Sequence, residues 1–358
     1  MLKSYKLYIQ PAELQTLNKN IWSDDPVPGT LKHDEKKYLI DVAYRGDSIR
    51  KNKKKSYQIT FRKPYIVEKN HVVHLNSEYK DPSLIRNKLS LDFFRSLGIL
   101  TPNAQHVLLI LNGQCRGIYL ELESFDEYFL KKWNLPEGGI FYATDNDANF
   151  SLLTEEEDAK TEILQGYSEV YDSNGKGEQL LSDLIFKINT LTNLEFEREI
   201  PKMIDVEKYL KWLSGVVCTQ NFDGFIHNYA LYWNSGTGLF EISPWDCDGT
   251  WGRNRHGELL PYDYIPIEGY NTLSARLLHH SAFRDLYKQI MEDILLNYFT
   301  EERLKPLIYS ELEKLQPWIE KDPYIKEKMH IILSEPLVML DFVRDRREYL
   351  SRELVRLI

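Results

Sequence analysis

Short runs of β-branched and aromatic residues, bounded by turn residues, follow one another through the first third of the chain. Such runs are typical of strands. The five runs are YKLYI, KYLIDVAYRG, KSYQITF, HVVHLN and HVLLILNG. One helix interrupts them, because residues 81–83 (Asp-Pro-Ser) form a start signal and apolar residues recur at helical spacing over 84–97, before Gly98 ends the pattern.

A hairpin and a short helix follow the last of these runs. Asn112-Gly113 is a strong two-residue turn signal, and the strand after it ends near Glu123. Residues 125–133 favour a short helix, and a double glycine at 138–139 precedes the strand IFYAT. We therefore expect residues 1–135 to form a β-rich small lobe.

Residues 136–358 are expected to form a mainly helical large lobe. The segment 144–180 is polar and predicts an exposed excursion. Asp205 caps a helix with an apolar period near 3.6, so one side of this helix is buried and its end leads into NFDGFIHN. The runs YALYW and LFEIS predict a hairpin. Three helical segments close the chain at roughly 273–298, 301–320 and 324–354, and Pro336 is expected to break or kink the last one.

Composition narrows the class of protein. With 13% aromatic and 28% charged residues, the 358-residue chain is expected to be globular. The net charge of −9 argues against nonspecific nucleic-acid binding and suits a basic partner. The three cysteines are far apart and odd in number, which favours reduced thiols over disulfides or a zinc site. We see no leader-like or membrane-spanning apolar run, so a reducing, cytoplasmic setting is expected.

Four polar residues in two short segments carry the candidate chemistry. Asp223 and Asn228 lie in NFDGFIHN with four residues between them, and PWDCDGT then supplies Asp246 and Asp248. In the protein-kinase catalytic loop the same spacing separates an Asp that accepts the proton of the attacking hydroxyl from an Asn that helps to hold Mg²⁺. A carboxylate on a following strand can hold that ion against nucleotide phosphates. The alternative for Asp-Cys-Asp is a turn whose acids bind backbone amides.

Basic residues cluster once, between two predicted strands. They are Arg45, Arg50, Lys51, Lys53, Lys54, Lys55, Arg62 and Lys63. We predict that Arg45, which closes one strand, and Lys55, which opens the next, neutralise nucleotide phosphates. The others are expected to be a solvated loop and edge strand. Neither GxGxxG nor GxxxxGK[ST] occurs here, so side-chain cations would replace a glycine-rich loop.

Four further nucleotide contacts are predicted. Tyr142 and Trp245 are expected to hold the base by stacking, with core packing as the alternative. Glu123 is a candidate partner for a cation such as Lys55, with a surface salt bridge as the alternative. Arg86 either reaches phosphate or ties its helix to a neighbouring carboxylate.

Taken together, these motifs resemble a known family. RGDSIRKNKKKSYQITF, DPSLIRNKLSLDFFRSLGI, LNGQCRGIYLELESFDEYFL, NFDGFIHNYALY and PWDCDGTWG occur in this order. Over residues 38–255 the chain is similar to the CotH family of atypical protein kinases associated with bacterial spore coats. The resemblance implies an α+β, two-lobed, kinase-like fold that binds ATP and Mg²⁺ and phosphorylates serines in basic, repetitive segments of spore coat proteins.

The resemblance also implies residue roles. Asp223 would be the catalytic-loop acid and Asp246 the metal-binding acid, while Asn228 and Asp248 are metal ligands assigned from spacing. The chain departs from ordinary kinases because it has no glycine-rich loop, no HRD (Phe222 precedes Asp223) and no DFG triplet. These departures bear on the phosphate-contacting groups more than on the reaction type.

We therefore expect an ATP- and Mg²⁺-dependent protein serine kinase that acts on spore coat proteins, first in the cytoplasm of the sporulating mother cell and then in the coat. Neither nucleic acid nor membrane is an expected partner. An alternative from another class is a catalytically weak pseudokinase that serves as a scaffold for coat assembly. A third possibility is transfer of a phosphoryl or nucleotidyl group to a small molecule.

Overall fold

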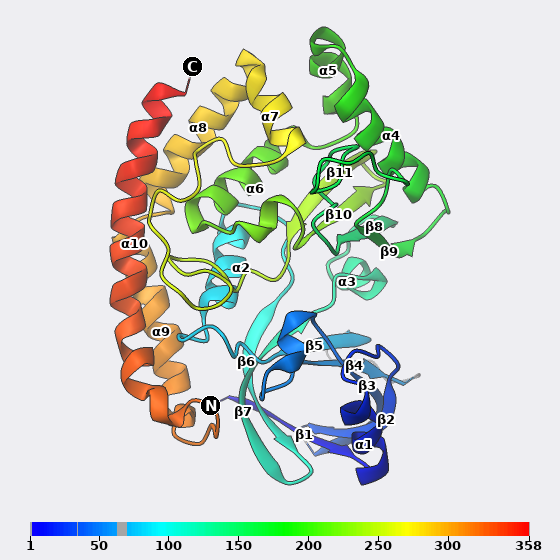
Figure 1. The fold of residues 1–358 in the computed structure, drawn as a ribbon, viewed down its shortest axis with the longest axis vertical. Coiled ribbons are helices and arrows are strands. Elements are labelled where there is room, and N and C mark those ends of the chain that lie inside the picture. Colours follow the sequence, from blue (N-terminus) through cyan, green and yellow to red (C-terminus); the bar gives the residue numbers. More distant parts are fainter. Residues whose placement is uncertain (1, 34, 63–69, 358) are drawn as a thin grey trace. The chain divides into compact units, whose positions relative to one another are not determined.

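The structure, a computed structural model, describes residues 2–33, 35–62 and 70–357 and divides into two compact units (Figure 1). Unit 1 takes the chain up to Lys88, then Pro102–Ser124 and Leu307–Pro336. Unit 2 takes Leu89–Thr101, Phe125–Pro306 and the chain from Leu337. The fold is mixed α+β, with a β-rich N-terminal region and a helical C-terminal region, as the sequence predicts.

Seven strands of unit 1 close into a barrel in the order β1-β2-β3-β4-β5-β7-β6. They are β1 (Lys3–Ile9), β2 (Val27–His33), β3 (Lys36–Tyr44), β4 (Tyr57–Phe61), β5 (Val72–Asn76), β6 (Ala104–Leu111) and β7 (Gln114–Glu123). β1 pairs with β6 in parallel, and the other pairs are antiparallel. Alternate residues of each strand point inward, so that Tyr5, Leu7 and Ile9 of β1 join the barrel core.

All five predicted strand runs overlap observed strands, and the predicted β6–β7 hairpin is confirmed. Asn112 and Gly113 both have positive φ (50° and 80°), as this two-residue turn requires. The sequence analysis missed β2 and the helix α1 (Pro11–Lys19). β2 was not predicted because it contains Pro28 and Gly29, which are uncommon in strands. Gly29 is favoured here by close packing, since a Cβ at this position would lie 3.2 Å from the Tyr8 carbonyl oxygen.

The predicted helix after Asp81 is α2 (Arg86–Ser96), which has residues in both units. The Asp81 carboxylate accepts the backbone N–H of Ser83 at 2.8 Å and of Arg86 at 2.9 Å, so the start signal acts as predicted. Gly98, with φ of 80°, follows its end.

Unit 2 contains an antiparallel sheet in the order β11-β10-β8-β9. Its strands are β8 (Gly138–Ala143), β9 (Tyr167–Asp172), β10 (Tyr229–Asn234) and β11 (Leu239–Pro244). The segment 144–180 was predicted to be an excursion. This is wrong for β9, which pairs with β8 as the edge of the sheet. Polar residues on one face are what an edge strand exposes, so β9 lacks the apolar signal of a buried strand.

Unit 2 also contains helices (Figure 1). They are α3 (Glu127–Lys132), α4 (Gly177–Thr190), α5 (Asn193–Glu199), α6 (Val206–Thr219), α7 (Thr272–His279) and α8 (Ser281–Asn297); α9 (Glu301–Ile319) and α10 (Met329–Arg356) have residues in both units. Short 3-10 turns are η1 (Ser48–Lys51), η2 (Ile200–Lys202), η3 (Asp223–Phe225) and η4 (Lys326–Lys328). α6 packs against α8 and β11, and α4 against β8 and α7.

Two expectations about the final helices need correction. The predicted helix 273–298 is two helices, because His280 adopts an extended conformation between α7 and α8. The expectation was a break or a kink at Pro336; the break is wrong, since α10 continues through this residue, and the kink stays a prediction. The units also differ from the predicted lobes, since Leu307–Pro336 belongs to unit 1 and Leu89–Thr101 to unit 2. The division into 1–135 and 136–358 stays a prediction.

None of the helices in the described part of the chain has the length and apolar character needed to cross a bilayer. The three cysteines, all within the described residues, form no disulfide.

A buried ion pair joins distant segments inside unit 1. Lys54 Nζ lies 2.9 Å from Asp322 Oδ2, and both side chains are fully buried. The same carboxylate accepts the Ile118 N–H at 2.9 Å. Gly117 has φ of 86°, and a Cβ there would lie 1.9 Å from Asp322 Oδ2. Burial lowers the pKa of Lys54, while the Asp322 carboxylate favours its charged form. Lys54 is therefore structural, which corrects its assignment to a solvated loop.

We predict that Asp322→Ala lowers the free energy of unfolding by about 3–5 kcal/mol, because Lys54 is left buried without its carboxylate. Chemical denaturation measures this loss. The double change Lys54→Met, Asp322→Leu should cost less, since no buried charge remains. Asp341→Ala, which removes a 62% exposed carboxylate from α10, is the control and should change stability by less than about 0.5 kcal/mol. Equal losses in Asp322→Ala and the control would refute the structural role.

Candidate active site

Helix α6 carries the chain to the candidate site in unit 2. Asp205 caps it by accepting the Lys208 N–H at 3.0 Å, as predicted. The helix ends at Gln220, a left-handed residue with φ of 55° whose N–H donates to the carbonyls of Val216 and Val217. The chain then turns into η3, so Asp223 lies in the turn that follows a buried, rigid helix.

A buried guanidinium holds the end of α6. Arg346 of α10 donates to the Val217 carbonyl from Nη2 at 2.7 Å and from Nε at 3.1 Å. Its Nη1 donates to the carbonyls of Ile265 at 2.7 Å and Tyr262 at 2.8 Å. Burial lowers the pKa of Arg346 to about 10. The planar fork of donors in arginine suits three carbonyls that converge in this way.

Two left-handed residues lie at the same end of the β10–β11 hairpin. Asn228 (φ 58°) directly precedes β10, and Asp246 (φ 47°) follows β11. The Asn228 carbonyl accepts the Trp245 N–H at 3.0 Å, and Asn228 Nδ2 donates to the Asp246 carbonyl at 3.3 Å. Positive φ is uncommon outside glycine, and such strain tends to cluster at functional sites. The structure thus brings two predicted metal ligands, Asn228 and Asp246, into contact.

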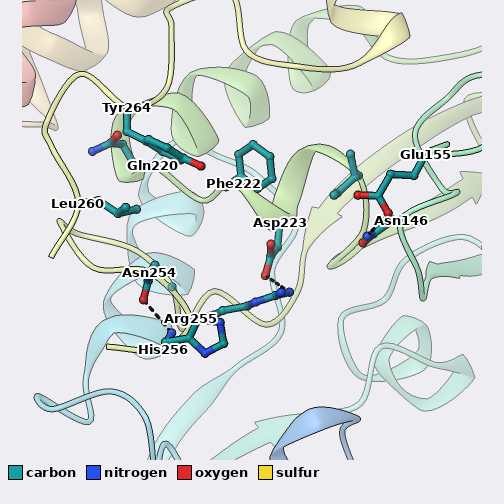
Figure 2. Close-up of a pocket in the computed structure, with 12 residues that line it drawn as sticks. Asn146, Glu155, Gln220, Phe222, Asp223, Asn254, Arg255, His256, Leu260 and Tyr264 are labelled. Atoms are coloured by element: carbon teal, nitrogen blue, oxygen red, sulfur yellow. Dashed lines mark hydrogen bonds and ion pairs between the residues drawn. The ribbon is translucent and has the colours of Figure 1, made fainter. Parts of the chain in front are cut away.

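Asp223 belongs to the same turn. Its carbonyl accepts the N–H groups of Ile226 at 3.2 Å and His227 at 2.9 Å, which fixes its position relative to Asn228. Its carboxylate is 20% exposed and lines a pocket of about 270 Å³ within unit 2 (Figure 2). Arg255 Nη1 lies 3.9 Å from Asp223 Oδ2. Asp223 is therefore accessible to a hydroxyl that enters the pocket.

The predicted metal ligands suit a magnesium ion in their chemistry. Asp246 and Asp248 are half-buried carboxylates, and Asn228 adds an amide oxygen. Among the described residues no cluster of three or more His, Cys, Asp or Glu side chains could hold a metal. Magnesium is commonly bound through one or two carboxylates and keeps further positions for phosphate oxygens and water. Two carboxylates and one amide oxygen are therefore a ligand set of the kind that magnesium binds.

The two predicted stacking residues lie together. The rings of Tyr142 and Trp245 have centroids 5.0 Å apart and an interplanar angle of 33°. Tyr142 Oη also accepts the Phe125 N–H at 3.0 Å. A base between the rings would need about 7 Å, twice the contact distance of carbon atoms. Trp245 is buried, in agreement with its core-packing alternative, whereas Tyr142 is half-buried. A nucleotide base would therefore stack on Tyr142 or move the two rings apart.

The remaining predicted residues lie in unit 1. Arg45 donates to the Asn76 side-chain oxygen, and Glu123 is buried and accepts the Asn103 N–H at 3.1 Å. Lys55 Nζ donates to the Arg50 carbonyl, so the predicted ion pair between Lys55 and Glu123 is not formed among the described residues. Burial lowers the pKa of Lys55. Phosphate binding by Arg45 and Lys55 stays a prediction, and Lys63 lies outside the described residues.

Arg86 takes the structural alternative. Its guanidinium is fully buried, with Nη1 at 2.7 Å from Asp81 Oδ1 and Nη2 at 2.7 Å from Glu335 Oε2. Both carboxylates are fully buried as well. Arg86 thus ties the start of α2 to the first turns of α10, and its predicted place among the nucleotide-binding residues is not retained.

Sequence reasoning missed three residues at the site. Arg255 and His256 line the Asp223 pocket, and Arg346 binds the carbonyl of Val217 near the end of α6, the helix that leads to Asp223. The short run RNRH contains two of them, but its two arginines are too few to stand out beside the longer basic cluster at 45–63.

These features define a mixed α+β protein in which acidic residues and an asparagine lie in turns, one after a buried helix and the others at one end of a hairpin. Comparison with known sequences adds the family: the chain belongs to the CotH family, because the family model described as "CotH kinase protein" matches residues 42–350. It is 48% identical over 354 residues to "Inner spore coat protein H" of Bacillus subtilis (strain 168), covering 99% of this chain and 98% of that protein.

A second relative is the "Inner spore coat protein H-like protein" of the same organism, 29% identical over 307 residues, 85% of this chain and 87% of that protein. Among solved structures, the proinflammatory kinase CtkA of Helicobacter pylori is 12% identical with a TM-score of 0.34, covering 92% of this chain and 93% of its own. A chain of the HipA–HipB toxin–antitoxin complex of Shewanella oneidensis MR-1 is 14% identical with a TM-score of 0.35, and the match covers 96% of this chain and 74% of that chain. Both TM-scores are low, and neither likeness carries a functional argument.

We predict that Arg346→Met lowers the free energy of unfolding by about 3 kcal/mol or more, because the carbonyls of Val217, Tyr262 and Ile265 lose their donors. Urea denaturation followed by tryptophan fluorescence measures the change. Arg352→Met removes a 55% exposed guanidinium from the same helix and should cost less than about 0.5 kcal/mol. A loss in Arg346→Met no larger than this control would show that Arg346 does not hold the frame of the pocket.

Proposed function

We propose that the protein is an ATP- and Mg²⁺-dependent protein serine kinase that phosphorylates spore coat proteins. The observation that carries this proposal is the turn that joins an accessible Asp223 carboxylate to Asn228, whose side chain contacts Asp246. Family membership and the 48% identity to an inner spore coat protein support the choice of substrate class.

In this mechanism the serine hydroxyl oxygen attacks the γ-phosphorus of ATP. The new bond joins serine Oγ to phosphorus, the bond from phosphorus to the β,γ-bridging oxygen breaks, and ADP leaves. The hydroxyl proton passes to a carboxylate oxygen of Asp223 as the new bond forms. The protein contributes by positioning and by charge, and the turn between Asp223 and Asn228 holds the base at a fixed place relative to the acids.

Asp246, Asp248 and Asn228 would hold Mg²⁺, which when bound neutralises charge on the phosphates. The backbone bonds around Asn228 keep these donors at one end of the hairpin before any ligand arrives, so little reorganisation is needed. Tyr142, which is half-buried and packs on the buried Trp245, would offer an aromatic surface for the adenine base.

The name of the first relative supports a place in the spore coat. We further propose that the protein acts first in the cytoplasm of the sporulating mother cell and then in the coat, with basic, serine-rich segments of coat proteins as substrates. The chain has 54 acidic and 45 basic residues, so its overall charge favours basic partners.

Incubation with labelled ATP, Mg²⁺ and a basic serine-rich peptide should label the peptide, and Asp223→Ala and Asp246→Ala should each lower the initial rate at least about a hundredfold. The loss follows because one variant lacks the base and the other a ligand of the ion. Asp285→Ala, which removes an exposed carboxylate from α8, is the control and should keep the wild-type rate. Equal labelling by wild type and both site variants would remove this mechanism.

ATP with Mg²⁺ should raise the thermal stability of the wild type, because a ligand that binds only the folded state stabilises it, by about 2.7 kcal/mol at a hundred times its Kd. Trp245→Ala should weaken ATP binding by roughly 1 kcal/mol through lost stacking, measured as a smaller ligand-induced shift than in Trp133→Ala, which removes an exposed indole. The absence of any shift at millimolar ATP would favour the pseudokinase scaffold.

A further inference from the structure

A tight hairpin shortly after Asp248 carries two basic side chains at its tip. Arg253 and Leu259 form an isolated antiparallel bridge, and Asn254 Oδ1 accepts the N–H groups of His256 at 2.8 Å and Glu258 at 3.0 Å. The Asn254 N–H in turn donates to the Glu258 carbonyl at 2.9 Å. These bonds close the tip tightly, so its side chains extend from a backbone with little freedom.

The tip is also packed against the segment that bears the candidate metal ligands. A Cβ at Gly249 would lie 2.8 Å from the backbone nitrogen of Arg255, so the glycine permits a close approach of the two chains. Gly249 directly follows Asp248. The backbone of Arg255 is therefore held next to the acids, and its side chain lines the Asp223 pocket (Figure 2).

The Arg255 guanidinium is available for a ligand. It is 59% exposed, and its 3.9 Å approach to Asp223 is too long for a hydrogen bond. It makes no hydrogen bond to any residue in 2–33, 35–62 or 70–357. The ion pair with Asp223 alone is expected to be weak, because one partner is largely in water. An exposed arginine held at a fixed place beside a base can instead use its five donors on an anion.

From this geometry we infer that Arg255 and His256 form an anion subsite for the acceptor peptide, and that the anion is the phosphate of a phosphoserine near the serine that enters at Asp223. The inference rests on the proposed function, because it takes Asp223 as the base. A guanidinium fork matches a phosphate bidentately, and an imidazole N–H adds one donor. The proposed reaction itself produces this ligand. Each phosphoserine formed in a repetitive segment would bind the subsite and place a neighbouring serine at Asp223 for the next transfer.

The acidic groups of the pocket set the orientation. Glu155 also lines it and accepts a hydrogen bond from Asn146 Nδ2 at 2.5 Å, whereas Glu258 is engaged by Asn254 Nδ2 at 2.9 Å. Figure 2 shows Arg255 and His256 on one side of Asp223 and Glu155 with Asn146 on another. A phosphate is attracted to the first side and a basic side chain to the second, so the pocket fits a peptide that carries both charges.

Fluorescence anisotropy without nucleotide tests this subsite directly. The probes are a fluorescein-labelled peptide of alternating serine and basic residues with one central phosphoserine, and the same peptide unphosphorylated. Wild type should bind the phosphopeptide on the order of tenfold more tightly. Arg255→Gln should abolish this preference, Arg255→Lys should keep part of it, and His256→Asn should reduce it. Arg198→Gln, which removes a 70% exposed guanidinium from α5, should leave the preference intact.

Equal affinity of wild type for the two peptides would overturn the subsite, as would an equal loss of preference in Arg255→Gln and Arg198→Gln. ATP binding by Arg255→Gln, read from the thermal shift, distinguishes the sources of phosphate. A loss of ATP affinity as large as the loss for the phosphopeptide would assign Arg255 to the nucleotide and overturn the proposal. The peptide-binding experiment needs no phosphoryl transfer. A failed labelling experiment would therefore refute the proposed kinase activity, while the preference for the phosphopeptide would still be tested by anisotropy.

Discussion

The geometry of the site depends on the buried guanidinium of Arg346. Its donors meet carbonyls at the end of α6 and in the segment that forms one wall of the Asp223 pocket. The Val217 carbonyl also accepts the Gln220 N–H, and its second lone pair is open to Arg346. Carbonyls in the last turn of a helix carry partial negative charge, so a buried cation is stabilised there without a carboxylate. Gln220 repeats the link, because its side chain donates to the Pro261 carbonyl at 3.0 Å and accepts the Ile265 N–H at 3.2 Å.

The same use of arginine recurs in unit 2 and gives its helices a common frame. Arg276 of α7 donates to the carbonyls of Ile188 at 2.7 Å and Leu191 at 2.8 Å, at the end of α4. Arg347 of α10 donates to the Leu295 carbonyl at 2.7 Å, near the end of α8. Each contact satisfies acceptors that the helix leaves open and removes a cation from solvent. The short turns that bear Asp223, Asn228 and Asp246 can then hold strained conformations, because the helices and strands around them are fixed independently.

How much the sequence could predict depended on whether the deciding contact is local. The Asn112-Gly113 turn, the Asp205 cap and the start signal at Asp81 act over a few residues, and all three are confirmed. The spacing of Asp223 and Asn228 is local too, and it located the turn. By contrast, the partner of Lys54 lies 268 residues away, and that of Arg346 lies 129 residues away. No pattern along the chain indicates such pairs, so Lys54 was assigned to solvent and Arg346 was overlooked.

Arg255 stands apart from the arginines that hold the helices. Arg346, Arg276 and Arg347 each have a fixed acceptor within the fold, whereas the Arg255 guanidinium faces water beside a carboxylate that is too far away for a hydrogen bond. Its backbone is nevertheless closely confined, since a Cβ at position 249 would lie 2.8 Å from the Arg255 nitrogen and only the glycine lets the hairpin tip approach. Holding this backbone in one conformation costs conformational entropy, and the solvated guanidinium contributes little stability in return because it makes no buried contact. Such an arrangement is understandable if the missing partner arrives with the ligand, because a charge held in advance has less freedom to lose on binding.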